Sequence, residues 1–172
     1  ATKMENTTKF KLEEHFNLEE FVNGFKKASD ILRMEKPDFI LAPVSGSVPF
    51  IDILAIVDRH FRLDSVAYIP NSSRFENREE LMRGWYSKFY DEYEMDKPLK
   101  FMCIDEVLSG ASALVGYKQF QKSIEERARK KAKGLSDESV AIEKFRRKLN
   151  KNLTYKIVGI AERGYKRNPK FN

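Results

Sequence analysis

Two adjacent acids and a short loop of serine and glycine follow an apolar segment in the middle of the chain. The acids are Asp105 and Glu106, and the loop Ser109-Gly110-Ala111-Ser112 comes shortly after them. Carboxylates can accept hydrogen bonds from ribose hydroxyls, or hold Mg²⁺, which prefers carboxylate and phosphate oxygens. Gly110 allows the backbone to approach a ligand closely, and the serine hydroxyls add hydrogen-bond donors. The segment therefore indicates a site for a phosphorylated sugar.

A second loop of similar composition lies earlier in the chain. Ser45-Gly46-Ser47 follows the apolar run 38–44, and Pro49, which suits a first helical position, comes next. Each loop opens a predicted helix, whose free N–H groups and positive dipole favour a phosphate. Serine and aspartate also cap helices in ordinary turns, so the Asp105–Ser112 segment alone does not decide between a ligand site and a cap.

The elements that must position these loops alternate between strand and helix. Strands are predicted over 38–44, 65–69, 99–104 and 155–161. Helices are predicted from Asn17, over 50–57 and 76–94, from Ser112 to a break at Gly134, and over 136–150 with Ser136 as its cap. This order predicts an α/β fold with a mainly parallel central sheet flanked by helices. In such sheets ligands bind outside the carboxyl ends of the strands, where both loops lie.

Length and composition favour one domain in a reducing compartment. We expect residues 1–172 to form a single domain, with an N-terminal helical segment at 1–36 and a helical insertion at 113–152 before the last strand. Cys103 is the only cysteine, which excludes an internal disulfide. No apolar run approaches the ~20 residues that cross a bilayer, and the N-terminus has no signal-peptide pattern. We therefore expect a cytoplasmic protein without a membrane partner.

The charge is unevenly distributed along the chain. Residues 1–112 carry 15 Lys and Arg against 20 Asp and Glu, whereas residues 113–172 carry 17 against 6. This basic C-terminal third suggests an anionic partner, which could be a phosphorylated ligand, a nucleic acid or an acidic protein. The alternative is that these side chains form solvated helix surfaces.

Other reactive residue types give weaker signals. Trp85, Tyr86, Phe89 and Tyr90 have helical spacing, which is more typical of a core or an interface than of a stacking site. Cys103 lies within a buried strand pattern and is expected to be inert. The chain has no Cys/His cluster with zinc spacing.

Both loops resemble those of a known enzyme family. The segment 101–113, an apolar strand with two acids and a Ser-Gly-x-Ser loop, resembles the phosphoribosyl pyrophosphate signature of type I phosphoribosyltransferases. The segment 43–49 resembles the pyrophosphate loop of the purine and xanthine–guanine branch, and 63–66 with Ser72-Ser73 resembles its next strand and the start of its mobile loop. The resemblance covers roughly residues 38–112, and two motifs in order are more specific than one.

The resemblance implies a phosphoribosyltransferase-like fold that binds phosphoribosyl pyrophosphate or a nucleotide and uses Mg²⁺. The residues that it implies for binding the ribose and its 5′-phosphate are Asp105, Glu106, Ser109, Gly110, Ala111 and Ser112. The residues that it implies for binding the pyrophosphate are Ser45, Gly46 and Ser47. Asp105 and Glu106 would also hold the metal, and together with Arg74 of the mobile loop they would be the catalytic residues.

Three departures from the family pattern leave catalysis open. In an ungapped alignment Ile104 replaces the first acid, Val44 replaces a frequent arginine, and Leu108 replaces a base-activating aspartate. One hypothesis is an active transferase acting on a nucleobase. The alternatives are a catalytically degenerate sensor or accessory protein of the same fold, and a protein whose basic helices bind nucleic acid. The additional helices at 76–94 and 136–150 could cover the site or form a homo-oligomer interface.

Overall fold

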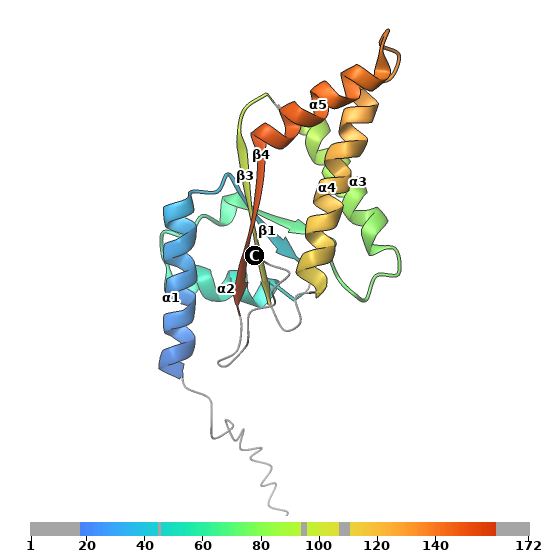
Figure 1. The fold of residues 1–172 in the computed structure, drawn as a ribbon. Helices are drawn as coiled ribbons and strands as arrows, with labels where there is room; N and C mark the ends of the chain where they lie inside the picture. The colour runs from blue at the N-terminus through green and yellow to red at the C-terminus, as the bar shows by residue number, and fades with distance from the viewer. Residues whose placement is uncertain (1–17, 45, 94–95, 107–110, 161–172) are drawn as a thin grey trace, which may run out of the picture.

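The computed structural model describes residues 18–44, 46–93, 96–106 and 111–160. The strands are β1 (Phe39–Pro43), β2 (Val66–Ile69), β3 (Leu99–Glu106) and β4 (Leu153–Ile160). The helices are α1 (Leu18–Glu35), α2 (Val48–Val57), α3 (Arg78–Glu92), α4 (Ala111–Ala132) and α5 (Glu138–Asn152), with a short 3₁₀ turn at Leu63–Ser65. Figure 1 shows how these elements are arranged.

The four strands form one parallel sheet in the order β2-β1-β3-β4. Ile40 lies opposite Val66 and Met102, and Asp105 lies opposite Gly159. The prediction of an α/β fold with a mainly parallel sheet is confirmed. Because all four strands run the same way, their carboxyl ends meet at one edge, which is where the two loops of interest begin.

Helices cover both faces of the sheet (Figure 1). On one face Leu41, Phe101 and Cys103 pack with buried side chains of α3 and α4. On the other face Ile40, Met102 and their neighbours pack with α1 and α2. Alternate residues of β1 and β3 thus supply two separate cores, as expected for strands buried on both sides.

The aromatic side chains of α3 belong to the core. Tyr86, Phe89 and Tyr90 are buried, and the Tyr90 hydroxyl lies 2.7 Å from the Oγ atom of Ser123 in α4. Burial raises the pKa of Tyr90, with the Ser123 hydrogen bond and the nearby Arg127 acting in the opposite direction. These contacts support the interpretation that the aromatic spacing reflects packing.

Two helix boundaries refine the predictions. Gly134 has a φ of +84°, a left-handed conformation typical of the residue that ends a helix, and it follows α4 as predicted. The cap of α5 is Asp137 and not Ser136, because the Asp137 carboxylate accepts the N–H of Val140 at 3.3 Å. Asn17, the predicted start of α1, lies outside the described residues.

None of the helices in the described ranges is both long and apolar enough to cross a membrane.

Candidate ligand site at the carboxyl edge of the sheet

Parallel strands bring several of the predicted site residues to the same edge. Ser47 lies between β1 and α2, Asp105 lies near the end of β3, and Ala111 and Ser112 begin α4. Asn71, just beyond β2, lies at the same edge. Figure 1 shows β3 and β4 ending at the same end of the sheet, where the first turn of α4 also lies.

Ser47 connects the two predicted phosphate loops. Its side chain is fully buried, and its Oγ atom donates a hydrogen bond of 2.7 Å to the carbonyl oxygen of Ile104. The hydroxyl is therefore engaged with β3 and does not cap α2, although Ser47 occupies the cap position. This bond holds the start of α2 directly beside the end of β3.

Gly46 is exposed beside Ser47. A Cβ atom at Gly46 would have nothing within 4 Å among the described atoms. Packing therefore does not explain the glycine, and the open space above it is compatible with a ligand that approaches the backbone closely.

Asp105 is buried on the α3–α4 side of the sheet, with an exposed fraction of 7%. It lies two residues beyond Cys103 and so shares the face of that thiol. Burial raises the pKa of the Cys103 thiol to about 12, and the Asp105 charge acts in the same direction. Cys103 is thus a buried, protonated thiol, which supports its prediction as inert.

Glu106 ends β3 and lies opposite Ile160 in the sheet. Its side chain lies outside the described part of the structure, so of the two predicted acids only Asp105 is placed. In the part of the chain that the structure describes, no group of three or more His, Cys, Asp and Glu residues could hold a metal ion. Mg²⁺ commonly binds through one or two carboxylates together with substrate phosphates. Asp105, a carboxylate at this edge, fits that mode.

Asn71 is a site residue that the sequence analysis missed. Its side chain is only 5% exposed, and its Nδ2 atom donates a hydrogen bond of 3.1 Å to the carbonyl oxygen of Ser112. It therefore connects the end of β2 to the first turn of α4. One signal could have identified it: a polar residue directly after Pro70, at the carboxyl end of a predicted strand.

Several predicted site residues cannot be placed. Ser45, Leu108, Ser109 and Gly110 lie outside the described residues. Ala111 is exposed and Ser112 half-buried at the start of α4. The described part of the 5′-phosphate segment is thus the first turn of a helix at the sheet edge.

Arg74 lies on the connection between β2 and α3. It is exposed, and its backbone N–H donates to the Oγ atom of Ser72 at 3.3 Å. The structure shows no contact between the Arg74 side chain and the described residues at the sheet edge. After residue 77 the chain forms α3, so a helix packed into the core occupies most of the segment where the resemblance implies a mobile loop.

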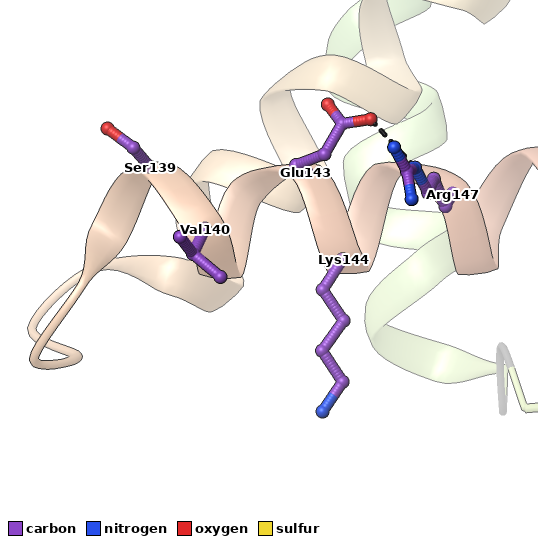
Figure 2. A pocket seen from close by; sticks show the side chains of 5 residues that line it. All are labelled: Ser139, Val140, Glu143, Lys144 and Arg147. Carbon is purple, nitrogen blue, oxygen red and sulfur yellow. Dashed lines mark hydrogen bonds and ion pairs between the residues drawn. The ribbon is translucent and has the colours of Figure 1, made fainter.

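Two hollows in the described surface do not include the predicted residues at the sheet edge. One of about 470 Å³ is lined by Ser139, Val140, Glu143, Lys144 and Arg147 of α5. Figure 2 shows that Lys144 extends away from the helix, whereas Arg147 is paired with Glu143. Another hollow, of about 500 Å³, lies over residues 73–83 at the start of α3. Neither hollow contains Ser47, Asn71 or Asp105.

Many side chains of the basic third are paired with acids. Arg127 binds Asp91 at 2.5 Å, Arg146 binds Glu125 at 2.6 Å, and Lys148 binds Asp96 at 2.5 Å. The Lys148–Asp96 pair is exposed and contributes little alone, whereas the Arg146–Glu125 pair is half-buried and the Arg127 side chain is largely buried. Their positions nevertheless show that part of the positive charge serves to connect α4 and α5 to neighbouring elements.

Comparisons with protein-family models, with curated proteins and with solved structures found no match for this chain.

Proposed function

We propose that this chain is a phosphoribosyltransferase-like protein that binds phosphoribosyl pyrophosphate, or the phosphate of a nucleotide, at the carboxyl edge of its sheet. The observation that carries the proposal is the buried bond from the Ser47 Oγ atom to the Ile104 carbonyl. It joins the loop that resembles a pyrophosphate site to the strand that resembles a ribose-phosphate site. The first turn of α4 supplies N–H groups beside them for a phosphate.

The proposed reaction transfers the phosphoribosyl group to a nucleobase. A ring nitrogen of the base attacks the anomeric carbon, the bond from that carbon to pyrophosphate breaks, and pyrophosphate leaves with the electron pair while the base loses a proton. Asp105 would accept hydrogen bonds from the ribose, Ser45 and Gly46 would hold the pyrophosphate, and Arg74 would offer positive charge from the β2–α3 connection. Ser47 would not contact the pyrophosphate, because its side chain is buried, its hydroxyl donates to Ile104 and its N–H donates to Pro43. Mg²⁺, held by Asp105 or Glu106 with ligand phosphates, would neutralise charge on the leaving group.

The alternative is a catalytically degenerate member of the same fold that binds a nucleotide or a macromolecule. Two observations favour it. Asp105 is almost completely buried, and the segment expected to close over the site contains a helix with three buried aromatic side chains. If the degenerate protein binds a nucleotide, both proposals share the phosphate site and differ in turnover; if it binds a macromolecule, the phosphate site is not required.

The test is a calorimetric titration of the chain with phosphoribosyl pyrophosphate, with and without Mg²⁺. We expect Mg²⁺-dependent binding that is lost in Asp105→Asn. Release of pyrophosphate with any common base then distinguishes the transferase from the degenerate protein, which binds without turnover.

Asp58→Asn is the matched control, because Asp58 is a hydrogen-bonded carboxylate that lies at the far end of α2. This variant should lose stability and keep binding. If the wild-type protein does not bind phosphoribosyl pyrophosphate, the phosphate site is rejected. Titration with single-stranded RNA over a range of salt concentrations then tests the basic surface.

A further inference from the structure

The hollow at the start of α3 is lined mainly by polar and charged side chains. Its volume is about 500 Å³, and its lining comes from one segment, the end of the β2–α3 connection and the first turns of α3. Small-molecule sites commonly have volumes of about 300–1,000 Å³. The charged residues that line this hollow are Glu76, Arg78, Glu79, Glu80 and Arg83.

Arg78 has a buried donor without an acceptor. Its Nη1 atom is buried and has no hydrogen-bond partner in the ranges that the structure describes. Arg83 shows the contrast, because its guanidinium contacts Glu126 at 3.3 Å and Gln119 at 3.2 Å. Removing a charged donor from water without an acceptor costs stability, and a bound ion is one explanation for such an atom in a native protein. The missing partner of a guanidinium is an acceptor, preferably an anion.

The position of Arg78 on α3 explains why its guanidinium is partly shielded from water. Arg78 precedes Met82 by one turn and Tyr86 by two turns, and both of these side chains are fully buried. Residues four apart lie on the same side of a helix, so Arg78 continues this buried row at its N-terminal end. Since Arg78 also lines the hollow, an acceptor can approach its side chain from there.

The glutamates of the hollow do not neutralise Arg78. Glu76, Glu79 and Glu80 are exposed, and none of them provides an acceptor for the buried Nη1 atom. Carboxylates beside the guanidinium repel a phosphate dianion more strongly than a singly charged carboxylate, and they attract a protonated amine. The charges around the hollow therefore favour a ligand with one carboxylate and a separate amine.

We propose that this hollow binds a small carboxylate through Arg78, and that its glutamates select a carboxylate that also carries a protonated amine. The planar guanidinium can donate two parallel hydrogen bonds to a carboxylate. Phe75, which is 40% exposed and lines the hollow, offers an apolar surface to the carbon chain between the two charged groups. The hollow does not include Ser47, Asn71 or Asp105, so this inference goes beyond the proposed function and does not depend on it.

The test is a titration with 6-aminohexanoate, followed by NMR spectroscopy of the backbone amides. We expect saturable shifts in residues 73–83. Hexanoate, which lacks the amine, should bind more weakly, and inorganic phosphate at neutral pH should bind more weakly than hexanoate. Tighter binding of phosphate than of hexanoate would overturn the choice of a carboxylate. If 6-aminohexanoate causes no saturable shifts in this segment, the site is rejected.

Arg78→Met separates loss of the site from loss of the fold. Methionine keeps an unbranched apolar side chain and removes the guanidinium with its unpartnered nitrogen. We expect at least about tenfold weaker binding of 6-aminohexanoate, the effect of losing a hydrogen bond to a charged group. The midpoint of urea denaturation should equal or exceed that of the wild-type protein. A lower midpoint would mean that the guanidinium has a partner within the protein, and it would overturn the proposal.

Lys88→Gln is the matched control for charge. Lys88 is exposed on the same helix and does not line the hollow, so this variant removes one positive charge from α3 without changing the site. It should bind 6-aminohexanoate as tightly as the wild-type protein does. Equal weakening in Lys88→Gln and Arg78→Met would show that binding follows net charge alone, and the site would be rejected.

The double variant Glu79→Gln/Glu80→Gln tests the selection of the amine. It should weaken binding of 6-aminohexanoate and strengthen binding of hexanoate, because the same carboxylates attract an amine and repel a lone carboxylate. Changes of the same sign for both probes would overturn the role of the glutamates. None of these measurements uses phosphoribosyl pyrophosphate, so their failure and failure of the proposed phosphate site are distinguishable.

Discussion

Among single residues, Asp58 at the end of α2 accepts three hydrogen bonds, two of which come from α1. Its Oδ2 atom accepts from the Ser29 hydroxyl at 2.5 Å and from Arg33 at 2.9 Å, and its Oδ1 atom accepts the N–H of His60 at 2.9 Å. The Ser29 bond first, and then Arg33, lower the pKa of Asp58 to about 2. The charged carboxylate is therefore the form that the folded protein stabilises.

Asp58→Asn should lower the free energy of unfolding by about 1.5–3 kcal/mol at neutral pH, the usual range for a hydrogen bond to a charged group. The pKa in the folded state lies below the ordinary value of 3.8, so this contribution is complete above that value and is lost as the pH falls toward about 2. Urea denaturation between pH 7 and pH 2 measures the difference between variant and wild type. A difference that stays constant below pH 4 would contradict the assignment.

The candidate site was predictable only for residues that carry a local signal. Ser47 and Asp105 follow predicted strands in polar loops, and the rule that carboxyl ends of parallel strands meet was enough to bring them together. The contact of Asn71 with α4 depends on how closely α4 approaches β2. Gly116, which lies 45 residues further along the sequence, allows that close approach. No periodicity or motif carries that information.

The positions of the helices and strands follow from the apolar pattern of the sequence, whereas the residues at which they end depend on the local backbone conformation. Four predicted strands and five predicted helices are present, because each has an apolar face long enough to specify its period. Ser136 and Asp137 are both good capping residues. Sequence alone does not distinguish them, since the cap is decided by which backbone conformation precedes the first turn.

Asp137→Ala should reduce stability by about 1 kcal/mol, because it removes the acceptor for the Val140 N–H at the start of α5. Ser136→Ala is the matched control: the residue is adjacent and exposed, and it does not cap the helix. Thermal denaturation of both variants gives the comparison. The assignment of the cap fails if Ser136→Ala costs as much as Asp137→Ala.

For the whole molecule, the basic third also has a structural role. Arg127 extends from α4 to α3, where Nη1 binds Asp91 at 2.5 Å and Nη2 donates to the Tyr90 carbonyl at 3.1 Å. Its side chain is only 13% exposed, whereas that of Arg147, paired with Glu143 within α5, is 80% exposed. The charge count along the sequence gives both residues equal weight as potential anion contacts, but their positions do not.

Arg127→Ala should therefore cost about 1–3 kcal/mol of stability, since it removes the donor to the Tyr90 carbonyl, leaves Asp91 with only the more distant Lys130, and removes a largely buried side chain between two helices. Arg147→Ala should change stability by less than about 0.5 kcal/mol, as is usual for exposed pairs within a helix. Urea denaturation of the two variants at the same salt concentration measures both values. Equal losses of stability in the two variants would mean that apolar contacts alone hold α3 against α4. Arg127 would then be as available as Arg147 to bind an anionic partner.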